Sequence, residues 1–173
     1  MARTLTQRFA FGRLSQERRT IIVPRERTIF VARVLLSLIF ILGGISKIFS
    51  FDTTADYMAS KGLVAIPLLL TVALIIEIVG GLAILTGTLA RPGAVLLFLY
   101  LIPVTLIMHD FWAVDAAARQ AQMVNFLKNL AVMGGLLMLA GYGPGRISVD
   151  ERWQERVGTP PGRGTQMSGE IRD

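Results

Sequence analysis

The sequence predicts an all-α membrane protein, a four-transmembrane-helix bundle with both termini cytoplasmic and a short interfacial helix between spans 1 and 2. Three observations support this prediction. Hydrophobic residues make up 53% of the 173 residues, more than a soluble domain of this size needs for its core. Four apolar stretches each approach the roughly 20 residues that cross the hydrocarbon core of a bilayer. Basic residues gather in segments that an even number of spans brings to one side.

Residues 1–27 form a basic arm ahead of the first span. Arginines outnumber acids in this arm, and Leu5, Phe9 and Leu14 recur at near-helical spacing, which indicates an amphipathic element. The arm is either a docking element for lipid or a partner, or a solvated tail on the positive side of the membrane. It lacks the features of a secretory signal, whereas an organellar transit peptide is the second interpretation.

The first span is predicted over residues 28–49, with Arg33 one turn in and Lys47 at its far end. We interpret Arg33 as a side chain that snorkels to the interface. Residues 50–62 should form the short interfacial helix, and Gly62 should end it.

The second span, residues 63–87, carries a single acid, Glu77, near its middle. A charged side chain at the centre of a membrane helix costs roughly 2.5 to 3.5 kcal/mol on insertion scales, so a lone acid there normally faces other helices or water. The pair Gly80–Gly81 follows and should let a neighbouring helix approach closely.

The third span, residues 92–108, leads into His109–Trp112, which has the aromatic and ionisable side chains typical of a membrane interface. A polar connection over residues 113–120 precedes the fourth span. That span covers residues 121–142 and contains three polar side chains related by helical steps: Asn125, Lys128 and Asn129.

The chain beyond the fourth span is rich in Gly, Pro and charge. We expect residues 151–173 to be a flexible tail with at most one helical turn around Trp153. The arginines of this tail, of the N-terminal arm and of the turn at Arg91 all fall on one side of the four spans, whereas the opposite loops hold Lys61 and Arg119. Both termini are therefore predicted to be cytoplasmic.

Composition excludes several classes of site. The absence of Cys rules out thiol nucleophiles, Fe–S clusters and sulfur-ligated zinc, and one His rules out bis-histidine haem ligation within the chain. We expect no metal and no redox cofactor bound by the chain itself, although a quinone could bind. The net charge of +6 lies mostly in the tails, which favours a lipid surface over nucleic acid as a partner.

The polar residues of the spans should converge in the outer half of the membrane. Lys128 is predicted to lie less deep than Glu77, but its long side chain can close part of the gap, which makes it the expected partner of Glu77. Such a cluster either fixes helix register or forms a pocket for a small headgroup such as a quinone carbonyl, with His109 exchanging protons. The catalytic candidates are Glu77, His109 and Lys128, and the candidate quinone or headgroup pocket comprises Lys47, Glu77, His109, Asn125, Lys128 and Asn129.

Several short motifs occur in order over about residues 28–150. They are Arg33 with Gly43-Gly44-Ile45-Ser46-Lys47, Glu77 with Gly80-Gly81, Gly87 and Arg91, His109 with Phe111, Lys128-Asn129-Leu130, Gly134-Gly135, and the closing run from Gly141 to Asp150. Together they resemble the DoxX family of four-helix membrane proteins, which includes DoxX/DoxD-like subunits of thiosulfate:quinone oxidoreductase. The N-terminal arm and the C-terminal tail depart from that pattern.

The resemblance implies a multi-pass bacterial inner (cytoplasmic) membrane protein associated with oxidoreductase assemblies; an organellar membrane is the alternative. Our leading hypothesis is an accessory subunit that docks a larger redox-active membrane complex through the N-terminal arm and C-terminal tail and contacts quinone. One alternative is a quinone-reducing oxidoreductase subunit with a polar pocket around Glu77, His109 and Lys128. The other is a small-solute or proton carrier, and whether the chain is an enzyme stays open.

Overall fold

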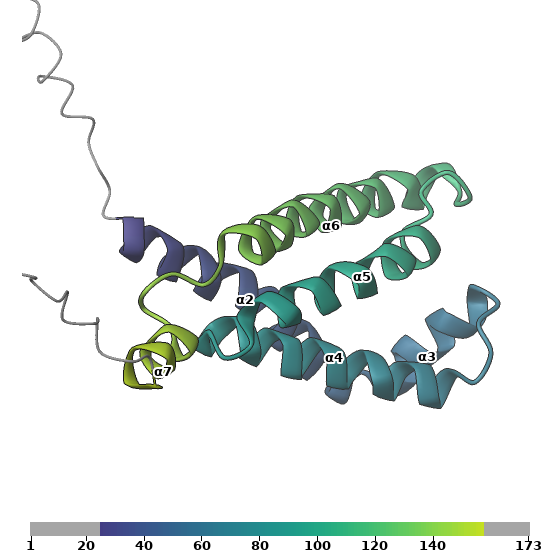
Figure 1. Cartoon of the computed structure of the whole chain (residues 1–173). Helices are drawn as coiled ribbons and strands as arrows, with labels where there is room; N and C mark the ends of the chain where they lie inside the picture. The colour runs from purple at the N-terminus through teal and green to yellow at the C-terminus, as the bar shows by residue number, and fades with distance from the viewer. Residues whose placement is uncertain (1–24, 158–173) are drawn as a thin grey trace, which may run out of the picture.

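The computed structural model describes residues 25–157, which contain six helices and no strand. They are α2 (Arg25–Phe49), α3 (Phe51–Ser60), α4 (Ile66–Thr86), α5 (Ala90–Met108), α6 (Ala116–Tyr142) and α7 (Val149–Val157) (Figure 1). The helices α2, α4, α5 and α6 are each long and apolar enough to cross a membrane. This confirms the all-α, four-span fold class. Nearly all of the basic arm and most of the C-terminal tail lie outside the described residues.

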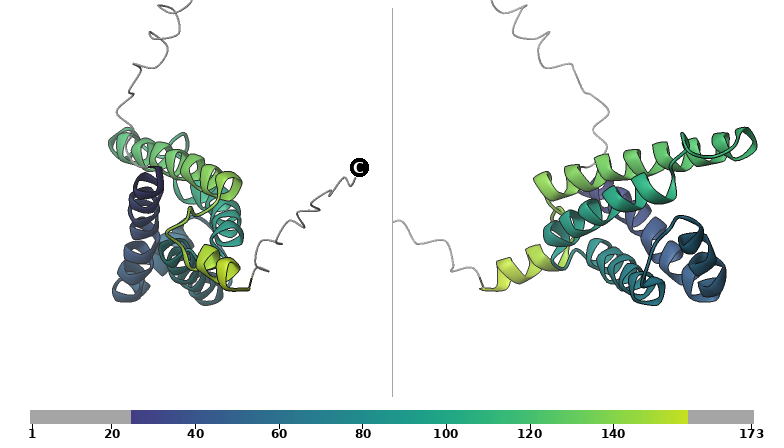
Figure 2. Two further views of the ribbon diagram at one scale, coloured as in Figure 1. Left: turned by 60° about the vertical axis from the view of Figure 1, so that its left-hand side comes forward. Right: turned by 90° about the vertical axis from the view of Figure 1, so that its right-hand side faces the viewer.

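The four long helices pack in a fixed order of neighbours. Helix α2 packs along α4, α4 along α5, and α5 along α6, whereas α6 meets α2 over a short stretch. At that meeting Leu36 of α2 lies against Gly135 of α6. Elsewhere the two helices diverge, and Figure 2 shows them crossing at a wide angle. Helix α4 therefore sits between α2 and α5, on the far side of α5 from α6.

Paired glycines let α4 approach both of its neighbours. A Cβ atom on Gly81 would lie 2.8 Å from Ile41 of α2, and one on Gly80 would lie 2.7 Å from Leu97 of α5. These positions have no room for a side chain, which confirms the packing interpretation of Gly80–Gly81. The buried core continues from this contact and consists of Phe40, Ile84, Ala94, Leu97, Leu101, Leu136 and Leu139.

Helices α4 and α6 begin several residues from their expected starts. Helix α4 begins at Ile66, later than predicted, because Ala65 has a left-handed backbone (φ 52°) that cannot continue a helix. Helix α6 begins at Ala116, earlier than predicted, because the Asp115 carboxylate accepts a hydrogen bond of 2.8 Å from the N–H of Ala118. Part of the expected polar connection therefore extends the fourth helix.

The segment after the fourth span contains more structure than expected. We predicted at most one turn around Trp153, but α7 is a helix of nine residues. It is joined to the α4–α5 turn by Asp150, whose carboxylate accepts from the N–H groups of Leu89 (2.9 Å) and Ala90 (3.2 Å). The same cap explains why α5 begins at Ala90, before the predicted start.

Both ends of the described chain lie at the same end of the bundle, where α2 begins and α7 ends (Figure 1). The short helix α3 lies against α4 at the opposite end. An even number of spans requires this arrangement of the ends. Which side of the membrane they face stays a prediction from the charge distribution.

Candidate functional site

Glu77 lies at the centre of a buried polar contact between three helices. Its carboxylate accepts from the Nζ of Lys47 on α2 (2.7 Å to Oε2 and 2.9 Å to Oε1) and from the hydroxyl of Tyr100 on α5 (2.6 Å to Oε1). Only 6% of Glu77 is exposed. A carboxylate in this position needs such partners, because an unpaired buried charge is strongly destabilising.

The predicted pairing of Glu77 with Lys128 is wrong. Lys128 lies on the exposed side of α6, and its Nζ donates to the Oδ1 of Asn125 at 3.0 Å. Helix α6 packs on α5, which separates it from α4. The reach of the Lys128 side chain therefore did not bring it to Glu77, and Lys47 occupies the place expected for Lys128.

Gly43 lies beside the ion pair. It lies one turn before Lys47 on α2, and a Cβ atom there would lie 3.4 Å from the Oε2 of Glu77. The Nζ of Lys47 also approaches the carbonyl oxygen of Gly43 at 3.5 Å. The carboxylate can thus lie against the backbone of α2, within reach of the Lys47 ammonium.

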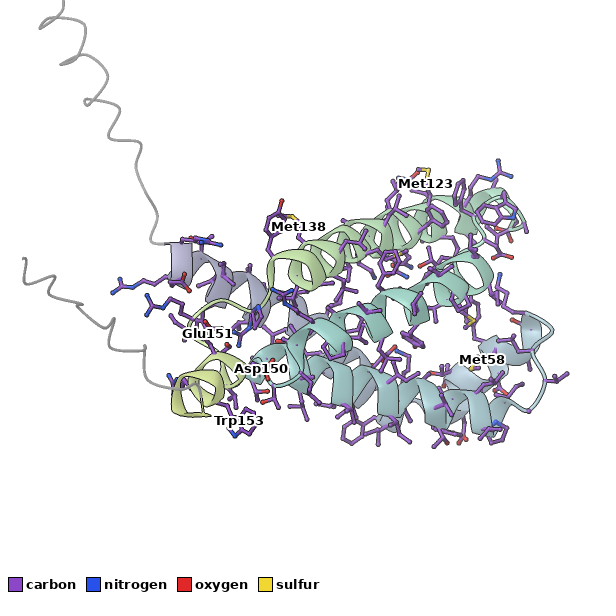
Figure 3. The ribbon with its side chains drawn as sticks, viewed as in Figure 1. Met58, Met123, Met138, Asp150, Glu151 and Trp153 are labelled. Carbon is purple, nitrogen blue, oxygen red and sulfur yellow. The ribbon has the colours of Figure 1, made fainter. Side chains whose placement is uncertain are left out.

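A cavity of about 450 Å³ lies between α3, α4 and α5, next to this ion pair. Its wall is mostly apolar and includes Met58, which lies on the side of α3 that faces α5 (Figure 3). The polar side chains in the wall are Lys47, Thr54, Tyr57, Tyr100 and His109. Lys47 and Tyr100 therefore connect the cavity to Glu77, which lies behind them.

Polar contacts close the cavity at the end of the bundle that carries α3. The Nδ1 of His109 lies 2.9 Å from the Oε1 of Gln122, whose Nε2 donates to the Tyr57 hydroxyl at 2.9 Å. That hydroxyl donates in turn to the carbonyl oxygen of Met108 at 2.8 Å. Gln122 and Tyr57 were missed in the sequence, although a polar residue at the start of the fourth span and a Tyr on the interfacial helix were both visible signals.

A second link joins α3 to the connection between α5 and α6. Lys61, which follows α3, forms an ion pair with Asp110. The hydrogen bond to this carboxylate raises the pKa of Lys61 above its ordinary value. Together with the Tyr57 contacts, this pair holds α3 over the cavity.

The remaining predicted pocket residues lie on α6 and do not line this cavity. Asn129 is buried and donates through Nδ2 to the Oγ1 of Thr105 at 3.2 Å, a contact that links α6 to α5. Asn125 is the partner of Lys128. Of the six predicted residues, the structure brings Lys47 and Glu77 into contact and places His109 in the wall of the same cavity.

Arg33 has a structural role that the sequence did not reveal. We interpreted it as snorkelling, but it is 2% exposed and donates to four carbonyl oxygens. The acceptors at the end of α4 are Ile84 (3.0 Å) and Leu85 (2.7 Å), and those in the loop after α6 are Pro144 (2.8 Å) and Ile147 (2.8 Å). Since the last carbonyl groups of a helix have no partner within it, Arg33 satisfies the end of α4 and fixes the loop beside it.

The chemistry of the cavity suits a lipophilic molecule with an oxygen-bearing head. Its apolar wall can enclose a ring, and Lys47, partly exposed beside the cavity, can turn the N–H of its long 3.5 Å contact with Gly43 toward a carbonyl or hydroxyl oxygen. Within residues 25–157, no group of three or more His, Asp or Glu side chains is arranged to hold a metal ion.

Comparisons with known proteins agree with this architecture. A family model described as DoxX matches residues 28–110. The inner membrane protein YphA of Escherichia coli (strain K12) is 38% identical over 128 residues, which are 74% of this chain and 91% of YphA. The inner membrane protein YqjF of the same organism is 34% identical over 122 residues, 70% of this chain and 88% of YqjF. No solved structure matches the chain.

Proposed function

The chain belongs to the DoxX family and is a multi-pass protein of the bacterial inner membrane, and from this premise we propose that it is an accessory subunit that binds the head of a membrane quinone and docks a larger redox-active complex. The observation that carries the proposal is the cavity beside Lys47 and Tyr100. Its volume of about 450 Å³ falls within the range of small-molecule sites, roughly 300 to 1,000 Å³.

A quinone fits the residues that surround the cavity. Its ring and the start of its apolar tail would contact the aliphatic side chains of α4 and α5, and one carbonyl oxygen would accept from the Lys47 ammonium. Glu77 holds Lys47 and Tyr100 in position through the two contacts described above. Because the chain has no Cys and one His, electrons for a bound quinone would come from a redox centre in the partner.

Lys128 supports the docking part of the proposal. It lies near the middle of α6, on the exposed side of the bundle, beside the exposed apolar residues Leu127 and Leu130. A charged side chain at this level of a membrane helix raises the free energy of the inserted chain unless it reaches water or an oppositely charged group. A carboxylate on a partner's transmembrane helix would satisfy it.

Photolabelling tests the quinone part. The purified chain in lipid nanodiscs would be labelled with an azidoquinone, and we expect labelled peptides from α3, α4 and α5 that disappear with excess unlabelled quinone. Ala73→Phe would fill the cavity and should abolish this labelling, whereas Ala131→Phe on the exposed side of α6 should not. Labelling that survives Ala73→Phe would rule out the cavity as the quinone site.

Purification from native membranes tests the docking part. In mild detergent the wild-type chain should bring down a stoichiometric membrane partner, and Lys128→Ala should reduce its recovery. Arg119→Ala, near the start of the same helix, is the matched control and should not. Recovery of this chain alone would show that it is not an accessory subunit.

The position of the Glu77 carboxylate favours a second candidate, a quinone-reducing oxidoreductase subunit in which Glu77 takes up protons from water and passes them to the quinone as a redox centre of the partner supplies the electrons. Lys128 has no part in this version, because it lies away from the cavity. Quinone reduction in reconstituted membranes would fall at least about tenfold on Glu77→Gln if the carboxylate transfers a proton. Unchanged activity at normal expression would leave only the accessory role.

A further inference from the structure

A second cavity, of about 880 Å³, lies at the end of the bundle opposite α3. Its wall is formed by the first turn of α2, the α4–α5 turn, the end of α6 and the start of α7. Three arginines and three acids line it, together with two exposed aromatic side chains. Nothing in the quinone proposal uses this cavity, so its charged groups need an explanation of their own.

Two of the three acids are already engaged by the backbone. The Glu26 Oε2 accepts from the N–H of Arg146 at 2.6 Å, and the Asp150 carboxylate caps the start of α5. The third acid, Glu151, has no hydrogen bond or ion pair from its carboxylate to any described residue. Glu151 is therefore the one acid in this wall whose charge the described part of the chain leaves uncompensated.

Two of the three arginines are free to bind an anion. Among the described residues, Arg25 and Arg91 have no hydrogen-bond or ion-pair partner. The Arg91 guanidinium lies against the backbone at Gly143, where a Cβ atom would be 2.8 Å from its Nη2. An arginine that keeps its N–H donors unused can bind a phosphate through two parallel hydrogen bonds.

The surroundings of the cavity place it at a membrane surface. It lies where the membrane-spanning helices end, and the exposed side chains of Tyr142 and Trp153 form part of its wall. Tyr and Trp are enriched at the level of lipid headgroups. Figure 3 shows Glu151 and Trp153 together on α7 at this end of the bundle.

We propose that this cavity binds the headgroup of an aminophospholipid, with its phosphodiester on Arg25 and Arg91 and its primary ammonium facing Glu151. The equal numbers of arginines and acids in the wall fit a zwitterion better than an anion. A primary ammonium also has N–H groups that can donate to a carboxylate, which a trimethylammonium lacks.

Tryptophan fluorescence can measure this binding directly. The chain has two tryptophans, so Trp112→Phe leaves Trp153, in the wall of the cavity, as the reporter. The full chain in detergent would be titrated with short-chain phosphatidylethanolamine, phosphatidylcholine, phosphatidylglycerol and inorganic phosphate. We expect phosphatidylethanolamine to bind at least about tenfold more tightly than each of the others, the factor that one charge-assisted hydrogen bond supplies.

Three variants in the same background test the residues. Arg91→Gln should weaken phosphatidylethanolamine binding by about tenfold or more, and Glu151→Gln should reduce it to the level of phosphatidylcholine. Arg119→Gln, at the other end of the bundle, should bind as the parent does. Equal binding of phosphatidylethanolamine and phosphatidylcholine, or of lipid and free phosphate, would overturn the proposal, and these two comparisons need no variant at the site. An equal effect of Arg119→Gln and Arg91→Gln would also overturn it.

Discussion

The ion pair between Lys47 and Glu77 predicts how stability should change when each member is removed alone and when both are removed together. Lys47→Met leaves the Glu77 carboxylate buried, with only the Tyr100 hydroxyl as a partner. Breaking a buried pair in this way costs about 3 to 5 kcal/mol, because the remaining charge is uncompensated. The loss should appear as a large decrease in the free energy of unfolding.

Glu77→Gln should lower the free energy of unfolding by less than Lys47→Met does. The double variant should lower it by less than the sum of the two single variants. Glu77→Gln leaves a lysine side chain that is 28% exposed and can turn toward water, so we expect a loss of about 1 to 2 kcal/mol. In the double variant no charge remains buried. The cycle should therefore show a coupling of about 2 kcal/mol between the two positions.

Unfolding of the purified chain by SDS in mixed micelles, followed by circular dichroism, would give these free energies. Lys128→Met is the matched control, since Lys128 pairs with Asn125 and does not contact Glu77. It should leave stability unchanged or raise it, because it removes an exposed charge from a membrane helix, and it should show no coupling to Glu77→Gln. Additive effects at Lys47 and Glu77, or coupling of Glu77 to Lys128, would refute the assignment of the pair.

Three further predictions concern the ends of the helices. Arg33→Lys should destabilise the bundle by about 2 to 4 kcal/mol in the same unfolding assay, because an ammonium cannot reach carbonyl groups on both sides as the guanidinium does; full stability would contradict this role. Gly87→Ala should cost about 2 kcal/mol or more, because φ is 74° and the new Cβ would lie 2.5 Å from Ser148, whereas Gly141→Ala, with open space around it, should be neutral or stabilising. Because the pKa of Lys61 is raised in the folded chain, its pair with Asp110 contributes stability below the ordinary lysine value of 10.5 and loses it as pH rises through the raised value. Protection of α3 from hydrogen exchange, measured relative to the intrinsic exchange rate at each pH, should fall over that range, and Asp110→Asn should remove this fall.

Apolar length made the four spans predictable. Glu77 was predicted to face other helices or water from the free-energy cost of a charge in the membrane core alone. The paired glycines that follow it were recognised as contacts between helices. Each of these features follows from a single helix and its solvent, so no knowledge of the neighbouring helices was needed. The start of α6 was missed because the Asp115 cap is a local signal that the apolar run outweighed.

The partners of the buried charges were not predictable in the same way. Depth along a helix limits which charged residues can lie near Glu77, but it does not say which helix packs beside α4 or which way each side chain points. The acceptors of Arg33 come from the end of α4 and from a loop that follows the fourth span. No periodicity in the sequence connects an arginine to backbone carbonyl groups that lie so far along the chain from it.

Arg33 also has a consequence for the order in which the chain can assemble during synthesis. Its acceptors become available in two stages, because Ile84 and Leu85 enter the membrane with the second span, whereas Pro144 and Ile147 are made after the fourth. Until then the first helix carries a guanidinium whose hydrogen bonds are incomplete, which favours an orientation nearer the membrane surface or contact with a chaperone. Residues made after the fourth span thus complete the position of the first of the four spans.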